Sequence, residues 1–570
     1  MVVAAQRGPS RLSQVAGSTD IPLQRRTVGE ALASAAQRWP EHAALVVSEQ
    51  HVRWTYAELA ARVEQLARAL IASGLRVGDR VGIWSPNCAE WVLTQFATAQ
   101  AGLILVNINP AYRVSELRFA LRKTGCRALL LADAFKSSDY LAMLREIIPE
   151  LAPGRKGTLL SAEFPDLRLL VNLGVARVDG FMPFESLLAQ AQAVTAQTML
   201  DISSSLSPQD AINIQFTSGT TGTPKGATLT HLNLVNNAFF VGEGMCLGET
   251  DRVCIPVPLY HCFGMVMGVL AAVTHGAASI FPGASFEPES VLRCVATERC
   301  TALLGVPTMF IAELEHPRFG EFDLSCLRTG IMAGAPCPIA VMRKVVDAMH
   351  MREITICYGM TETSPVSFQS STDDPLERRV GTVGRIHPHV EVKIVDGDDA
   401  TVECGASGEL CTRGYSVMRG YWDEPQRTAE VLDSQGWMHT GDLAVLDDQG
   451  YCNIVGRVKD MIIRGGENVY PREIEEFLFT HPKILDVAVV GVPDQRYGEA
   501  VCAVVRLRAG AVATDQEIQA FCQGQIAHYK VPRYVRFVDE FPMTVTGKVQ
   551  KFVIREIVQR ELNLQGEATA

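Results

Sequence analysis

The segment QFTSGTTGTPKGATLTH, at residues 215–231, contains an unbroken run of small, hydroxyl-bearing and basic side chains directly after a strand-like IQF. Glycines allow a backbone to approach an anion closely, hydroxyl groups donate hydrogen bonds, and lysine supplies positive charge, which together suit a polyphosphate. The run is not a Walker A loop, because Lys225 follows proline and precedes glycine. The predicted phosphate contacts are Thr217, Ser218, Gly219, Thr220, Thr221, Gly222 and Lys225.

A second segment, YGMTETSPV at residues 358–366, combines an aromatic ring, hydroxyl groups and one carboxylate. Glu362 offers the hard oxygen ligand that Mg²⁺ prefers, and Thr361 beside it can donate to a phosphate. Tyr358 presents a flat face on which adenine could lie, although a buried core tyrosine explains this residue type equally well.

Asp442 and Arg457 form a third candidate pair, in HTGD and in the GR that follows it. The carboxylate of Asp442 can accept two hydrogen bonds from the hydroxyls of a ribose. Arg457 is permanently charged and suits a ribose or phosphate contact. The pair therefore predicts a contact with the ribose of a nucleotide.

These segments resemble, in the same order, the motifs of the adenylate-forming superfamily, which includes acyl-CoA synthetases, luciferases and the adenylation domains of peptide synthetases. Residues 215–231 resemble its phosphate-binding signature, 358–366 its adenine and metal motif, and GWMHTGDL at 436–443 its ribose motif. VGRVKDMIIRGGENVYPREIE at 455–475 is similar to its hinge and following loop, and MTVTGKVQK at 543–551 to its C-terminal lysine motif. The resemblance spans about residues 30–560.

The resemblance implies a role for each matching residue. AGAP at 333–336 is similar to the segment that passes beside adenine, so the expected adenine contacts are Gly334, Ala335, Pro336, Tyr358, Gly359 and Met360. The remaining expected roles are the hinge residue Lys459, the CoA-proximal residues Gly465, Gly466 and Glu467, the metal ligand Glu362, and the catalytic residues Lys548, Thr361 and His261.

Lys548 is the residue expected to carry the chemistry. Attack of a carboxylate on the α-phosphate brings two anions together, and an ammonium group between them lowers the barrier electrostatically. The resemblance further implies that the segment carrying Lys548 rotates about Lys459 between two half-reactions.

The acid substrate is indicated by PLYHCFGMVMGVL at residues 258–270, where His261 precedes an apolar, glycine-spaced helix. In the family this position lies at the mouth of the acyl site. Tyr260 and His261 stand where peptide-synthetase domains carry an aspartate, which disfavours an α-amino acid. No tryptophan occurs between residues 260 and 270, where some long-chain enzymes carry a gating one, so medium-length acids are favoured.

The formal net charge of −11 disfavours a nucleic-acid partner, since such proteins usually carry a basic domain. The 15 cysteines form no CxxC pair and no cluster with the spacing of zinc ligands, which is typical of buried thiols in a reducing compartment. No apolar run reaches the roughly 20 residues of a membrane helix, and Phe263–Ile280 is predicted to be a buried helix and strand. Residues 1–26 are predicted to be a flexible leader, with a cytoplasmic location favoured over mitochondrial targeting by this leader.

Helical patterns alternate with short apolar strands such as 80–84 and 128–132, and a helix is predicted over 56–74. The predicted fold class is α/β. A large domain at 27–457 consists of parallel-sheet α/β layers with a small barrel-like part after about residue 380, and 458–570 forms a small mobile α+β lid.

The sequence therefore predicts an acid–CoA ligase that uses Mg²⁺, ATP and CoA to activate a fatty acid, with a homodimer possible. Four alternatives stay open. They are a ligase for an aryl, cyclic or branched acid, transfer to a carrier-protein thiol, a luciferase-like oxygenase, and a non-catalytic module that binds acyl-adenylate.

Overall fold

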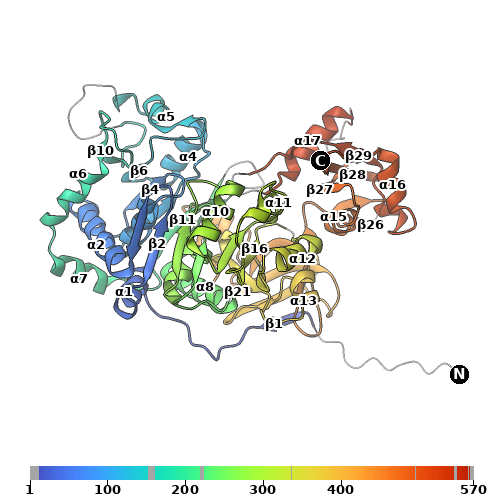
Figure 1. The fold of residues 1–570 in the computed structure, drawn as a ribbon, viewed down its shortest axis with the longest axis horizontal. Coiled ribbons are helices and arrows are strands. Elements are labelled where there is room, and N and C mark those ends of the chain that lie inside the picture. Colours follow the sequence, from blue (N-terminus) through green and yellow to red (C-terminus); the bar gives the residue numbers. More distant parts are fainter. Residues whose placement is uncertain are drawn as a thin grey trace.

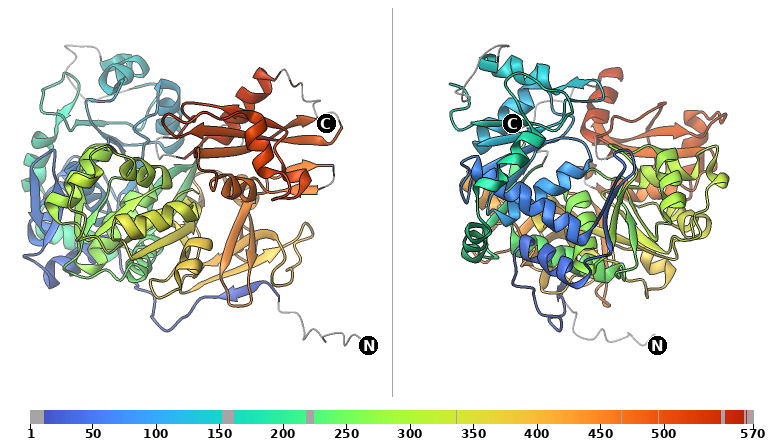
Figure 2. Two further views of the ribbon diagram at one scale, coloured as in Figure 1. Left: turned by 45° about the vertical axis from the view of Figure 1, so that its right-hand side comes forward. Right: turned by 60° about the vertical axis from the view of Figure 1, so that its left-hand side comes forward.

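The computed structural model describes residues 12–151, 161–217, 224–335, 337–465, 467–494, 496–544, 548–562 and 564. Two large sheets with their helices make up the body of the molecule, and the C-terminal segment, red in Figure 1, forms a smaller unit at one end of it. A turned view shows this small unit seated above the body (Figure 2). The predicted α/β class is confirmed.

The first large sheet contains a run of parallel strands that ends in an antiparallel pair. Its strands lie in the order β10 (Met182–Pro183), β9 (Leu169–Asn172), β6 (Ala128–Leu131), β4 (Arg80–Trp84), β5 (Ile104–Asn107), β11 (Ala211–Thr217), β12 (Lys225–Thr230) and β22 (Gly420–Tyr421). Strands β10 to β11 are parallel, whereas β12 pairs antiparallel with both β11 and β22. The two predicted strands at 80–84 and 128–132 are β4 and β6.

The second large sheet is parallel at its centre and antiparallel at both edges. Its order is β19 (Arg385–Ile386), β18 (Val366–Gln369), β17 (Glu353–Gly359), β16 (Thr329–Ala333), β15 (Ala302–Gly305), β13 (Arg252–Cys254), β14 (Ala278–Phe281), β2 (Ala43–Val47) and β3 (Val52–Thr55). Strands β17 to β2 run parallel. Their residues are almost continuously buried, because helices cover both faces.

The two sheets share one apolar core, to which Val81 and Leu105 contribute from the first sheet and Leu45 and Val253 from the second. Its helices are α1 (Val28–Arg38), α2 (Tyr56–Ala72), α3 (Ala89–Gln100), α8 (His231–Gly244), η3 (Phe263–Leu270) and α9 (Ala271–His275). Capping boxes begin α1 and α2, since a threonine before each helix bonds the N–H of a glutamate three residues later, and that carboxylate bonds the threonine N–H. The predicted helix over 56–74 is confirmed, and the apolar stretch at 263–280 is a helical segment followed by β14.

Other helices cover the outer faces of the two sheets. Those of the first sheet are α4 (Val114–Thr124) and α5 (Tyr140–Ile147), and those of the second are α10 (Pro288–Glu298), α11 (Pro307–Leu314) and α12 (Ile339–Ala348). Further helices are α6 (Phe184–Leu188), α7 (Ala196–Ser205), α13 (Leu376–Gly381) and α14 (Pro425–Ala429). None of the helices in the described ranges is long and apolar enough to cross a bilayer.

The part predicted to be barrel-like is an open antiparallel sheet. Its order is β1 (Gln14–Ala16), β20 (Val390–Val395), β21 (Gly408–Gly414), β23 (Met438–Leu446) and β24 (Cys452–Arg457). Its two outer strands, β1 and β24, do not pair with each other, so this sheet does not close. Strand β1, from the predicted leader, pairs with β20 and occupies an edge that a barrel would have joined.

The small unit is built on a second five-stranded sheet. Its strands are β26 (Glu467–Val469), β25 (Ile462–Arg464), β28 (Gly498–Leu507) and β27 (Ile484–Asp494) in that order, with β29 (Tyr534–Phe537) beside β28. Helices α15 (Pro471–Leu478), α16 (Asp515–Cys522) and α17 (Lys551–Glu561) pack on it over two apolar clusters. A turn at residues 458–460 joins β24 of the body to β25 of the small unit.

Candidate active site

Three parallel strands end where predicted site residues begin, namely β11 at Thr217, β16 at Ala333 and β17 at Gly359. The carboxyl edge of an open α/β sheet is where such folds bind ligands. Gly334, directly after β16, has φ +87°, a conformation that favours glycine. A Cβ there would lie at the ordinary contact distance of 3.4 Å from Cε of Lys548, so the lysine side chain lies against the backbone at Gly334.

Glu362 lies in a short 3₁₀ turn after β17 and faces the phosphate segment. Its Oε1 accepts hydrogen bonds from Oγ1 of Thr217 at 3.2 Å and from the hydroxyl of Tyr421 at 3.0 Å. Thr361 beside it is buried. Among the described residues no hydrogen bond engages Oε2 of Glu362, and a carboxylate oxygen among hydroxyls fits Mg²⁺, which commonly takes one or two carboxylates plus substrate phosphates.

The carboxylate of Asp442 is held between two hydrogen-bond donors. The hydroxyl of Tyr358 donates to Oδ2 at 2.6 Å, and Nε of Arg457 lies 3.1 Å from Oδ1. Asp442 and Arg457 are direct partners in the β23–β24 pairing, which places them on one face of the sheet. Burial raises the pKa of Asp442, and Arg457 and Tyr358 oppose that rise. A carboxylate has about four acceptor positions, so this one keeps capacity for a pair of hydroxyls.

Lys548 reaches this site from the small unit. Its backbone N–H donates to Oγ1 of Thr544 at 3.0 Å, and its carbonyl accepts from the Thr544 N–H at 2.8 Å. Burial lowers the pKa of Lys548, and Arg457 lowers it further, whereas Asp442 and Glu362 raise it. The ammonium group is therefore enclosed among the same charges that surround the predicted nucleotide position.

His261 precedes η3, a π-helical segment whose residues are all buried. Nδ1 of His261 accepts the N–H of Phe263 at 3.2 Å. Burial and the nearby Lys548 lower the pKa of His261 to about 3, so the imidazole is neutral at physiological pH. π-Helical turns frequently mark functional sites, and this one begins beside the charged cluster.

The residues predicted to form the hinge and to lie near CoA are on the linker and on the first hairpin of the small unit. Lys459 is exposed in the turn after β24. Slight desolvation and repulsion from the cations Lys225 and Arg457 lower the pKa of Lys459. Gly465 and Glu467 lie in the hairpin of β25 and β26, and Glu467 is exposed to solvent.

Most of the predicted site residues thus converge, but not all can be placed. Ala335 lies in the bend after β16, and Met360 follows β17. Seven predicted contacts lie outside the described residues: Ser218, Gly219, Thr220, Thr221, Gly222, Pro336 and Gly466.

Tyr421 is a site residue that the sequence alone did not indicate. Its hydroxyl group donates to Glu362, and the Nζ atom of Lys225 lies over its ring, 4.8 Å from the ring centre. It reaches the site because β22 pairs with β12, which sets Tyr421 opposite Ala227. The available signal was the aromatic pair in GYWDEP, a short segment far along the chain from the phosphate loop.

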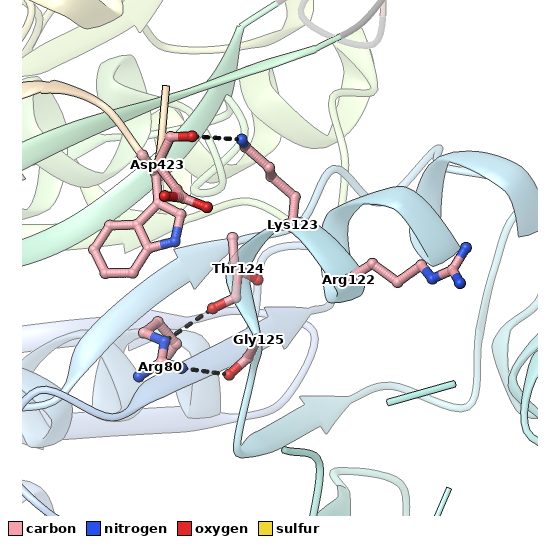
Figure 3. Close-up of a pocket in the computed structure, with 7 residues that line it drawn as sticks. Arg80, Arg122, Lys123, Thr124, Gly125 and Asp423 are labelled. Carbon is pink, nitrogen blue, oxygen red and sulfur yellow. Dashed lines mark hydrogen bonds between the residues drawn. The ribbon is translucent and has the colours of Figure 1, made fainter. Parts of the chain in front are cut away.

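A surface pocket of about 470 Å³ lies outside this cluster (Figure 3). Two of the basic side chains that line it have partners: Nζ of Lys123 donates to the carbonyl of Asp423 at 3.2 Å, and Arg80 donates to the carbonyls of Thr124 and Gly125 at 2.8 and 2.9 Å. These bonds hold the C-terminal end of α4 in place, so the role of these basic side chains is structural.

The model of the family described as "AMP-binding enzyme" matches residues 32–422, and that of "AMP-binding enzyme C-terminal domain" matches residues 473–548. The chain belongs to the AMP-binding enzyme family. Lys548 is the last residue of the second match, and Lys225, Tyr358 and Glu362 fall within the first. The recognition of the adenylate-forming superfamily from its motifs is therefore confirmed.

Relatives of this AMP-binding enzyme match it over nearly their whole length. A protein of Bacillus subtilis named "Putative acyl-CoA synthetase YngI" is 48% identical over 95% of this chain and 99% of its own. "Medium-chain acyl-CoA ligase ACSF2, mitochondrial" of Bos taurus is 46% identical over 97% and 91%.

Solved structures show the same fold. The anthranilate CoA ligase AuaEII, in complex with anthranoyl-AMP, has a TM-score of 0.84 at 26% identity and covers 96% of this chain and 99% of its own. ATP-bound MatB from Rhodopseudomonas palustris has a TM-score of 0.78 at 28% identity, covering 95% and 100%.

Proposed function

We propose that this chain is an AMP-forming acid–CoA ligase that activates a medium-chain fatty acid. The observation that carries the proposal is the convergence of Lys548, from the small unit, on Gly334, Asp442 and Glu362 of the body. Such an arrangement suits a nucleotide bound between the two units, with its α-phosphate within reach of the ammonium group.

In the first half-reaction the carboxylate of the acid attacks the α-phosphorus of ATP, and pyrophosphate leaves. Asp442 is proposed to accept the ribose hydroxyls while Tyr358 and Arg457 hold its carboxylate in place. Lys548 offsets the repulsion between the carboxylate and the phosphate oxygens. Glu362 would hold Mg²⁺, which supplies charge neutralisation at the phosphates.

In the second half-reaction the thiolate of CoA attacks the carbonyl of the mixed anhydride, and AMP leaves. The small unit is proposed to turn about Lys459, which withdraws Lys548 and brings the hairpin with Gly465 and Glu467 to the site. The solvent exposure of the turn at 458–460 supports this proposal.

A medium-length acid is supported by two observations. The segment after His261 lacks a tryptophan that could gate a long tunnel, and the relative from Bos taurus is named as a medium-chain ligase. The cytoplasmic location and the homodimer stay predictions from the sequence.

The test is a pyrophosphate-release assay over straight-chain acids from acetate to palmitate, with benzoate and anthranilate added, each with and without CoA. We expect one maximum between the two ends of the straight-chain series, with AMP and acyl-CoA formed only when CoA is present. A maximum at an aromatic acid would replace the substrate assignment but keep the reaction. Pyrophosphate release with none of these acids would refute the proposed ligase.

A further inference from the structure

Three cysteine thiols meet in the core beneath the second sheet, outside the site described above. Cys254 ends β13, Cys294 lies in α10, and Cys300 follows the end of that helix. Their Sγ atoms all lie within 4.8 Å of one another, and this is the one group of three or more potential metal ligands within that distance across the described ranges. Each is buried, with 0%, 5% and 0% of its surface exposed, respectively.

The end of α10 creates this cluster. Arg299 adopts a left-handed conformation with φ +51°, so the chain reverses after the helix. The N–H of Cys300 then donates to the carbonyl of Val295 at 3.0 Å, which returns Cys300 to the last helical turn beside Cys294. Strand β13, to which Cys254 belongs, pairs with β15 just after this turn and brings the third thiol.

The spacing of the sulfurs is close to that of a three-coordinate centre. An atom at the middle of a triangle with sides of at most 4.8 Å lies no more than about 2.8 Å from each sulfur, while metal–thiolate bonds measure roughly 2.3 Å. A contraction of about half an ångström per thiol would therefore close the site, which rotation about the cysteine χ1 angles can provide.

The donor set favours one chemical class of ligand. Three sulfurs without an imidazole or carboxylate select a soft, thiophilic centre, and structural zinc would need a fourth ligand. The net charge of the complex narrows the choice of bound ion further, because a buried charge without a partner is costly. The nearby cation Arg252 is already paired with Glu298 at 2.6 Å. Three thiolates leave a net negative charge around a monovalent or divalent ion but none around a trivalent one.

We propose that Cys254, Cys294 and Cys300 form a binding site for trivalent arsenic, taken up from arsenous acid. Three S–H and three As–O bonds break, three As–S and three O–H bonds form, and three water molecules leave. Neither arsenic nor sulfur changes oxidation state, so no oxidant or reductant takes part. Because all three thiols are buried, uptake requires local opening at the end of α10 and is slow.

The test uses the full-length protein, kept reduced with a phosphine rather than a thiol. It is incubated with arsenous acid and freed of unbound arsenic by gel filtration, after which arsenic per chain is measured. We expect one atom per chain for the wild type and at least a tenfold loss of retention in Cys294→Ser and in Cys300→Ser. Cys337→Ser, which changes another buried thiol outside the cluster, is the matched control and should retain arsenic like the wild type.

X-ray absorption on the unmodified protein gives a second measurement that does not depend on a variant folding. Three sulfur neighbours around arsenic are expected. Two sulfurs and one oxygen would indicate an adventitious dithiol and overturn the proposal. Equal retention in the cluster variants, or an arsenic-free wild type that takes up zinc instead, would overturn it as well.

Discussion

Replacing Lys548 with alanine should separate the two half-reactions. The ammonium of Lys548 lies among Arg457, Asp442 and Glu362, and burial lowers its pKa, so its charge acts in a medium less polar than water. Two unit charges about 4 Å apart interact by about 4 kcal/mol at an effective dielectric constant near 20. If Lys548 faces the reacting oxygens at that distance, its loss slows adenylation by roughly a thousandfold.

Single-turnover pyrophosphate release measures the first step, and thioester formation from synthetic acyl-AMP measures the second. We expect the large loss in the first step alone, since the second does not bring a carboxylate to a phosphate. Lys483→Ala is the control, because Lys483 is a surface lysine of the same unit, paired with Glu517 at 2.7 Å, and neither rate should change. Equal losses in both steps for Lys548→Ala would refute the assigned role and point to a general loss of structure.

Tyr358→Phe removes the hydroxyl that donates to Asp442 at 2.6 Å and should raise the KM for ATP by roughly 10- to 150-fold, from about 1.5–3 kcal/mol for a bond to a charged group. An ATP titration with an unchanged KM would show that this bond does not orient Asp442. Burial raises the pKa of the Glu313 carboxyl group, so protonation of this group stabilises the folded state. That contribution to the free energy of unfolding is complete below about pH 4.5 and is lost as the pH rises through the raised pKa. Glu313→Leu should therefore gain more in Tm at about pH 8 than at about pH 5, and a gain independent of pH would contradict this account. Arg508 of the small unit and Glu315 of the body lie 2.9 Å apart, and Arg508→Ala should slow adenylation by no more than about fivefold, as expected for an exposed pair. Glu315→Gln should slow adenylation by the same factor, and the double variant should be no slower than either single variant. If the two losses add in the double variant, the ion pair does not account for them.

The sequence predicted those parts of the site in which local spacing determines the geometry. Asp442 and Arg457 face each other because a hairpin joins their strands, and a hairpin is a short-range feature. Gly334 and Tyr358 were predicted from the short motifs AGAP and YGMTETSPV, and they directly follow and lie near the end of two parallel strands, respectively. The carboxyl end of a buried parallel strand lies at one edge of the sheet, so a motif residue at that end is placed at the same edge as the other site residues.

Contacts that depend on long-range pairing were not predictable in this way. Tyr421 reaches Glu362 only because β22 adds to the edge of the first sheet beside β12, and nothing in either short segment specifies that pairing. The sheet containing β20 was expected to be barrel-like because its strands are rich in valine, glycine and turns. Composition indicates antiparallel strands but does not say whether the first and last of them meet, and here β1 takes an edge.

The charge of the site is opposite to that of the chain, and this contrast explains how an acidic protein can bind a polyphosphate. The chain carries a net charge of −11, yet Lys225, Arg457, Lys459 and Lys548 gather around the two described carboxylates of the site. The cations act on one another, since Arg457 lowers the pKa of both lysines of the linker and the small unit. Such mutual repulsion is unfavourable in the empty site and is relieved when an anion binds between them. Release of pyrophosphate removes part of that negative charge while the phosphate of the acyl-adenylate stays, which supports the proposed turn of the small unit about Lys459.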